Sequence, residues 1–262
     1  MIPYRHTDGR TLLLGKLPAK YDSRRLRLKD YLPKVTPPPS ANWYQGVTQF
    51  GMMLNNSLGD CTCAAVGHAE QVVTLNIPFG EIVPSDQSIE NLYEGSCGYV
   101  PGDPSTDNGG YIPDVLNYVR KYKWFTHKHP PLYAYCDTEP GDVDHIKQGI
   151  ATFSVVDIGL QLPITAQNQV GSLWTVVGNP NDPSSDAYPG SWGGHSVVVS
   201  AYDANTLTCI TWGELQAMDW NFWQTYVDES HCLLLRLWLQ HFAAGSGVDF
   251  ASLDAALQAL ND

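Results

Sequence analysis

The 262-residue chain contains no apolar run that approaches the roughly 20 residues a helix needs to cross a bilayer. Its first residues, MIPYRHTDGR, lack the apolar segment and small-residue cleavage site of a secretory signal. No CxxC pair occurs, and Cys61 and Cys63, two residues apart, would point to different faces of a helix. We therefore expect a soluble protein with no signal peptide, no membrane partner and no metal site.

Positive charge is scarce. Acidic residues outnumber Lys and Arg by 27 to 15, which gives a formal net charge of −12. Such a surface repels phosphate backbones, so we expect no nucleic-acid partner. The short basic run formed by Arg24, Arg25, Arg27 and Lys29 is typical of an exposed helix face.

The composition is that of a folded globule. Hydrophobic residues make up 43% of the chain, enough to bury a substantial core without covalent staples. The six cysteines could pair, but a chain of this length does not depend on disulfides. We expect mostly free thiols.

Residues 1–50 are rich in proline and basic residues, ending in PKVTPPPSANW, where successive prolines favour an extended chain. This segment is interpreted as an extended N-terminal arm wrapped on the body and not as a domain, and copies of the chain could also assemble through it. Residues 51–262 then form the folded body.

Helical periodicity dominates the first part of that body, about residues 51–150. In CTCAAVGHAEQVVTLN, apolar residues recur at helical spacing from Cys61 onward, which predicts a central buried helix. Further helices are predicted around Ile89 to Tyr93, in YIPDVLNYVRKY, and from Val143 to Gly149.

The second part, about residues 151–235, has the pattern of antiparallel strands. TFSVVDIGLQLP predicts a strand, and SVVVSAY and LTCITWG flank the turn of a hairpin. WNFWQTYVD is helix-like, HCLLLRLWL is an apolar segment, and a helix is predicted at about 249–261. Helices followed by strands define the α+β class.

The stretch NNSLGDCTCAA carries the strongest chemical signal. Cys61 stands where the central helix begins, and a helix N-terminus lowers the pKa of a thiol. Gly59 permits a tight turn, and the amide of Asn55 could donate to an oxyanion. His195, at the mouth of a strand in GGHSVVV, is the candidate base.

Three blocks taken in order, Asn55 to Thr62, Gly193 to Val197 and Thr211 to Gly213, resemble the papain-like cysteine peptidases, most closely their bacterial and phage-encoded branch. The resemblance covers about residues 50–225. It implies a papain-like fold in which Cys61 attacks an acyl carbonyl, His195 pairs with it, and the residue at Asn55 donates to the oxyanion.

The sequence also departs from this family at specific positions. Asn55 stands in place of a glutamine, and Ile210 falls where the family's orienting asparagine would lie. Thr211 could replace that asparagine only if the strand register shifts by one, because neighbours on a strand face opposite sides. Trp212 fits equally a core aromatic and a shield over His195, and Asp60 is expected to cap the helix through its side chain.

The resemblance implies a thiol hydrolase that cleaves peptide or isopeptide bonds in a peptide or protein substrate, without a cofactor. One alternative is a catalytically impaired papain-like scaffold in a structural or binding role, such as a component of a phage particle. Another is an amidase acting on cell-wall peptides. The corresponding locations are the cytoplasm or a virus particle.

Overall fold

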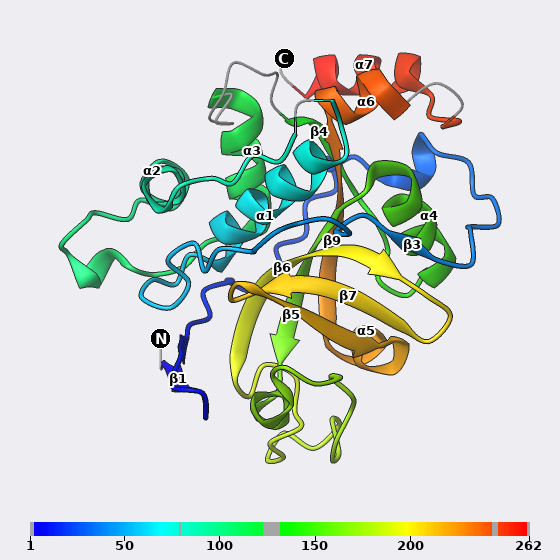
Figure 1. Ribbon diagram of the computed structural model, residues 1–262. Helices are drawn as coiled ribbons and strands as arrows, with labels where there is room; N and C mark the ends of the chain where they lie inside the picture. The colour runs from blue at the N-terminus through cyan, green and yellow to red at the C-terminus, as the bar shows by residue number, and fades with distance from the viewer. Residues whose placement is uncertain (1–2, 79, 123–131, 243–245, 261–262) are drawn as a thin grey trace.

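The computed structural model describes residues 3–78, 80–122, 132–242 and 246–260. Parts of the expected arm, helical half and C-terminal helix therefore lie outside the described residues, at 1–2, 79, 123–131, 243–245 and 261–262. Helices from the first half of the chain gather beside an antiparallel sheet built mainly from the second half (Figure 1). The α+β class predicted from the sequence is confirmed.

The central helix α1 spans Cys61–Leu75 and is buried along almost its whole length. It packs on the sheet, mainly against strand β6 (Gly193–Tyr202), and against helices α2 (Asp86–Cys97) and α3 (Ile112–Tyr122). Small side chains in α1 allow this close packing on several sides. The helix start that carries Cys61 is thus fixed between the two layers.

The main sheet has the strand order β4-β9-β5-β6-β7-β8, and β3 (Ala41–Asn42) pairs with β6. Every pairing in it is antiparallel. The remaining strands are β4 Leu132–Asp137, β5 Val156–Leu162, β7 Thr206–Thr211, β8 Glu214–Asp219 and β9 Val227–Leu235.

Several element bounds differ from those that the sequence predicts. Helix α2 is longer than the expected 89–93 piece, because Ser85 caps its start and Gly98, with φ of 76°, ends it. Helix α4 runs to Phe153 and so takes residues expected in a strand. The other helices are α4 Val143–Phe153, α5 Trp220–Tyr226, α6 Arg236–Phe242 and α7 Phe250–Ala259.

Strands β4 and β8 were not foreseen, and the apolar segment HCLLLRLWL divides between β9 and α6. Strand β9 is buried on both faces in the middle of the sheet, so it lacks the alternation that identifies a half-buried strand. A short apolar run of this kind does not separate strand from helix.

The arm packs on its own body. It includes β1 (Tyr4–Arg5), β2 (Thr11–Leu12) and a 3-10 turn at Leu28–Asp30. Five arm leucines are buried in the cluster that covers one face of the sheet, namely Leu12, Leu14, Leu26, Leu28 and Leu32. In Figure 1 the blue arm rises from the N-terminus to the junction between α1 and the sheet.

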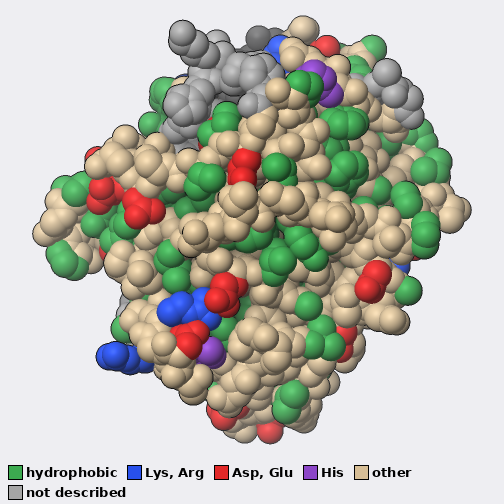
Figure 2. All heavy atoms as spheres, in the orientation of Figure 1, with side chains coloured by type: hydrophobic (Ala, Val, Ile, Leu, Met, Phe, Trp, Pro, Cys, Tyr) green, Lys and Arg blue, Asp and Glu red, His purple; other side chains and the backbone are tan. Residues whose placement is uncertain are grey.

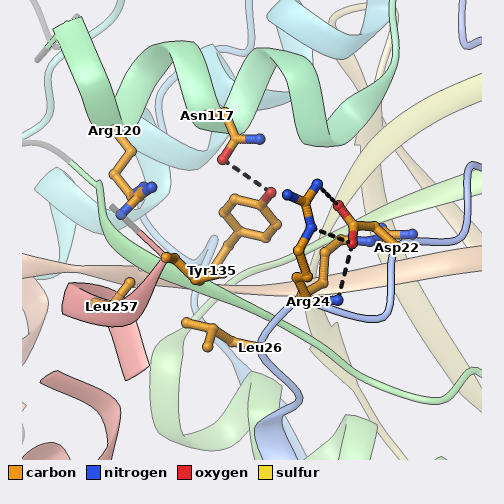
Figure 3. A pocket seen from close by; sticks show the side chains of 9 residues that line it. Asp22, Arg24, Leu26, Asn117, Arg120, Tyr135 and Leu257 are labelled. Atoms are coloured by element: carbon orange, nitrogen blue, oxygen red, sulfur yellow. Dashed lines mark hydrogen bonds and ion pairs between the residues drawn. The ribbon is translucent and has the colours of Figure 1, made fainter. Parts of the chain in front are cut away.

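The basic run at residues 24–29 is not a helix face, contrary to expectation. Arg24 pairs with Asp22, while Arg25 is mostly buried and lies 3.4 Å from Asp137. Figure 3 shows Asp22 and Arg24 beside Asn117 and Arg120 of α3, around a pocket of about 280 Å³. None of the candidate site residues lines this pocket.

The surface agrees with the acidic composition. On the face in Figure 2, Lys and Arg side chains are few, and some of them lie directly against acidic side chains. None of the described helices is long and apolar enough to cross a membrane. All six cysteines lie within the described ranges, and none of them forms a disulfide.

Candidate active site

Cys61 is the first residue of α1 and is 1% exposed. Its Sγ accepts a hydrogen bond from the backbone N–H of Ser196 at 3.4 Å, which ties the helix start to β6. Asp60 occupies the N-cap position, but its side chain makes no capping hydrogen bond, contrary to expectation. Burial raises the pKa of Asp60 well above its usual value, which favours a neutral carboxyl beside the thiol.

His195 is held on two sides. Its Nε2 lies 2.6 Å from Oγ1 of Thr211. The indole of Trp212 stacks on the imidazole with ring centroids 4.4 Å apart and planes at 15°. Nδ1 has no hydrogen-bond partner among the described residues. If Nε2 carries the proton and donates it to Thr211, Nδ1 keeps a lone pair and is free to act as a base.

The sheet register explains why Thr211 meets the histidine. Val198 of β6 lies directly opposite Ile210 of β7, so these two side chains share one face. Because side chains alternate along a strand, His195 and Thr211 both belong to the other face. The sheet therefore has the register in which Thr211, and not Ile210, lies on the same face as His195. Ile210 belongs to the buried cluster formed mainly by side chains of α1, α2 and α3.

A tight turn follows Thr211. Thr211 pairs with Glu214, so Trp212 and Gly213 form a two-residue hairpin loop. Both loop residues have positive φ, 46° for Trp212 and 76° for Gly213, as this class of hairpin turn requires. The turn places the indole over the imidazole. Trp212 is thus both a buried core aromatic and a ring covering His195.

Asn55 lies in the loop before α1 and is 2% exposed. Its side-chain Nδ2 donates to the backbone carbonyl of Leu58 at 3.2 Å, and its backbone carbonyl accepts from the N–H of Leu13 in the arm. In this state the amide closes the loop ahead of Cys61. The first N–H groups of α1 lack intrahelical partners and provide further donors near the sulfur.

Arm residues 13–17 lie across this site. The N–H groups of Gly15 and Lys16 both donate to the carbonyl of Gly194, at 3.2 and 3.1 Å. Gly110 donates to the carbonyl of Gly15 at 2.8 Å and accepts from the N–H of Leu17 at 2.9 Å. The arm therefore runs between the helical half and the sheet, and Lys16 forms an isolated parallel bridge with Gly110.

The contact at Gly15 leaves no room for a side chain. A Cβ on Gly15 would lie 1.8 Å from the carbonyl oxygen of Gly59, and a Cβ on Gly109 would lie 2.0 Å from that of Gly15. The indole Nε1 of Trp212 also donates to the carbonyl of Leu13 at 3.0 Å. The arm is thus seated directly on the turn before Cys61 and on the ring that covers His195.

Burial by these contacts sets the protonation of the pair. Burial raises the pKa of Cys61 to about 12, although the N–H of Ser196 opposes this shift. Burial, together with a smaller contribution from nearby His68, lowers the pKa of His195 to about 3. At neutral pH both groups are uncharged, so the covered site holds a thiol and a neutral imidazole.

Among the other expectations, His68 is a packed helix histidine, with Nε2 2.9 Å from the carbonyl of Gly51. The described residues include no group of three or more His, Cys, Asp or Glu side chains placed to hold a metal ion. No sequence pattern indicates a role for Lys16 or for the carbonyl of Gly194. A glycine beside the candidate histidine was the one indication that another backbone approaches closely there.

Comparison with known proteins identifies the fold of the chain. No protein-family model matches the chain, and no curated protein matches it. Solved structures of papain-like cysteine proteases do match, over most of its length. The chain has the papain-like fold.

Three solved structures illustrate the likeness. Xylellain, a cysteine protease from Xylella fastidiosa, is 17% identical with a TM-score of 0.62, covering 90% of this chain and 99% of its own. A digestive procathepsin L2 proteinase from the Tenebrio molitor larval midgut is 16% identical with a TM-score of 0.55, covering 86% and 78%. The Carica candamarcensis cysteine protease CMS1MS2 in complex with E-64 is 15% identical with a TM-score of 0.51, covering 76% and 99%.

Proposed function

We propose that the protein is a thiol hydrolase of peptide bonds that uses Cys61 as nucleophile and His195 as base and acid, and that its N-terminal arm holds it inactive. The observation that carries this proposal is the state of His195. Nε2 lies against Thr211, Nδ1 has no hydrogen-bond partner among the described residues, and the next residue along the strand contacts the sulfur of Cys61. This arrangement fits a base oriented toward a thiol.

The proposed reaction needs only the residues described. Nδ1 of His195 removes the proton of Cys61, and the thiolate sulfur bonds to the carbonyl carbon of the peptide. The resulting oxyanion accepts hydrogen bonds from N–H groups at the start of α1 and from the amide of Asn55 once that amide is released from Leu58. The C–N bond then breaks as His195 returns the proton to the leaving amine. Water then attacks the thioester carbonyl while His195 takes one of its protons; the C–S bond breaks, the acid product leaves, and His195 returns the proton to the sulfur of Cys61.

The arm explains why the pair is uncharged in this state. Removal of both groups from water raises the pKa of the thiol and lowers that of the imidazole. Both shifts oppose an ion pair. Withdrawal of residues 13–17 would restore solvent around both groups. The pKa of Cys61 is then expected to fall and that of His195 to rise, toward the range in which proton exchange is effective.

The scaffold alternative was motivated by Ile210, by Asp60 and by the arm. Thr211 now offers an acceptor where Ile210 cannot, burial favours a neutral Asp60, and the arm leucines pack into their own chain. These observations favour a working site over an impaired one. They do not favour cell-wall peptides over other peptides.

Cutting the arm tests the proposal. Residues 18–21 are exposed, with Tyr21 91% exposed, so a recognition sequence for a specific protease can be inserted between Lys20 and Tyr21. After cleavage, residues 1–20 are held only by bimolecular contacts and dissociate on dilution. Hydrolysis of labelled casein should appear on dilution, should vanish in Cys61→Ala and should persist in Cys97→Ala. Equal hydrolysis by the Cys61→Ala protein would refute the proposal.

A further inference from the structure

The side chain of Lys16 is fully buried in the sheet next to the candidate active site. Its Nζ lies 2.9 Å from a carboxylate oxygen of Asp228 and 3.0 Å from one of Glu229, and it donates to the carbonyl of Leu17 at 3.2 Å. An ammonium group is rarely removed from water unless carboxylates compensate its charge. The pocket around Lys16 therefore has the chemistry of a cation site.

The walls of this pocket leave room for a long side chain. A Cβ on Gly159 of β5 would lie 2.0 Å from Cε of Lys16, and a Cβ on Gly194 would lie 2.2 Å from the backbone carbonyl oxygen of Lys16. Glycine at these two positions thus makes the space that the lysine fills. Nε2 of Gln161 donates to Asp228 at 2.7 Å, which fixes that carboxylate toward the pocket.

Further charged groups lie behind the pocket floor. The second carboxylate oxygen of Glu229 lies 3.1 Å from Nε2 of His231 and 3.9 Å from Arg25. Asp157 is fully buried and accepts a hydrogen bond from Ser196 at 2.9 Å, and its second carboxylate oxygen has no hydrogen-bond partner in the described part of the chain. Glu229 therefore keeps cationic neighbours when Lys16 leaves, whereas Asp228 loses the ammonium it pairs with.

Lys16 follows the arm residue that packs against the turn before the candidate nucleophile. Gly15 lies on the turn before Cys61, and Lys16, the next residue, is held by the carbonyl beside His195. We propose that, once the arm is withdrawn, this pocket selects substrates that carry Lys or Arg within two residues of the cleaved bond. The inference rests on the proposed function, because it names the substrate class of the same site. Lys16 occupies the place of that substrate side chain.

The first experiment identifies the preferred residue without assuming a position. The arm-cut protein is incubated with peptides that a glutamate-specific protease releases from a denatured protein mixture, and new termini are read by mass spectrometry. Lys and Arg should be enriched at one position within two residues of the cut. Replacing that Lys by norleucine in a synthetic peptide should lower kcat/KM about 10- to 100-fold, since the buried carboxylates are left unpaired.

A pocket variant links this preference to the residue that forms it. Asp228→Asn should lower kcat/KM for the Lys peptide about tenfold and raise that for the norleucine peptide, because the charged side chain loses a partner whereas the uncharged one no longer leaves this carboxylate unpaired. Glu139→Gln is the matched control, because Glu139 pairs with Lys29 on the surface. Its two peptide rates should both be unchanged.

The outcomes separate the two proposals. The proposed Lys/Arg preference fails if cleavage depends on Cys61 but shows no Lys or Arg enrichment. It also fails if kcat/KM is equal for the Lys and norleucine peptides. Either result leaves the proposed thiol hydrolase activity standing. Binding of a synthetic arm peptide, residues 10–20, to the arm-cut protein is measured in parallel. Norleucine in place of Lys16 in the arm peptide tests the pocket directly. If this replacement weakens binding tenfold while no peptide is cleaved, the proposed hydrolase activity fails and the cation pocket stands. Unchanged binding overturns the cation pocket.

Discussion

Oγ1 of Thr211 lies 2.6 Å from Nε2 of His195 at the last residue of strand β7. The position before it, Ile210, faces the helical core with its partner Val198. The hydroxyl that contacts the imidazole therefore belongs to the residue one place further along the chain than the position at which the resemblance places the orienting asparagine. The hydroxyl can accept a hydrogen bond from Nε2–H, in which tautomer Nδ1 keeps its lone pair, and the Trp212 ring covers one face of the imidazole.

Replacing Thr211 by Val tests whether the hydroxyl orients the base. Val keeps the branched shape but leaves Nε2–H without its acceptor, so kcat of the arm-cut protein should fall about 10- to 100-fold with little change in KM. Thr211→Ser should restore most of the rate. A Val variant as active as the Ser variant would show that the contact is structural only.

Gly15→Ala tests the arm contact without altering the pair. A methyl group at 1.8 Å from the carbonyl oxygen of Gly59 forces the arm away from Cys61. Overpacking of this kind costs about 1–3 kcal/mol, which corresponds to an increase in the open population of about 5- to 150-fold. Uncut protein should show that rise in peptide hydrolysis. Gly141→Ala is the control, because a Cβ there meets nothing within 4 Å, and its rate should equal that of the parent.

The order of cysteine alkylation reports on the same transition. In the intact protein Cys97 should react with iodoacetamide first, because it is partly exposed and its hydrogen bond with Cys63 lowers its pKa. Cys61 should react slowly up to high pH, because burial holds its pKa near 12. After the arm is cut, Cys61 should overtake Cys97 at pH 6, and His195→Ala should abolish that advantage. An unchanged order after cutting would contradict arm control.

The sequence was sufficient for the fold class and for the positions of most helices, because amphipathic spacing and the hairpin turn are local signals. It gave Cys61 at a helix start for the same reason. The contact between Thr211 and His195 does not follow from local signals, because the face on which a strand residue lies depends on its register against a neighbouring strand. A shift of one residue exchanges Ile210 and Thr211 beside His195.

The arm shows a different limit. Its prolines indicated an extended segment, but residues 13–17 carry no periodic signal, and their bonds to Gly110 and Gly194 join parts of the chain that are far apart in sequence. Lys16 resembles any surface lysine until Asp228 and Glu229, more than 200 residues later, are placed around it. Contacts of this kind follow from tertiary structure alone.

Asn55→Ala tests the oxyanion donor. The amide bonds to Leu58 while the arm is seated, and it must turn toward the reacting carbonyl to contribute. Loss of one oxyanion donor costs about 10²- to 10³-fold in kcat, so the arm-cut variant should show a fall of that size with KM little changed. Asn56→Ala, at the exposed neighbouring position, should retain full activity. A loss confined to thermal stability would assign Asn55 to the loop alone.

The charged cluster behind the pocket predicts a pH dependence of stability. Burial would lower the pKa of His231, but hydrogen bonds to Asp137 and Glu229 outweigh it and raise that pKa to about 9. A raised folded pKa stabilises the protein fully below the unfolded value of about 6.5, and the contribution is lost as pH rises through 9. The shift corresponds to about 3 kcal/mol in the free energy of unfolding.

Urea unfolding at pH 6, 7.5 and 9 should show this decline in the parent and a flatter profile in His231→Gln. His145→Gln serves as control, because burial lowers the pKa of His145 and its linkage lies at more acidic pH. Parallel profiles for the parent and His231→Gln would mean that His231 is not held in its charged form.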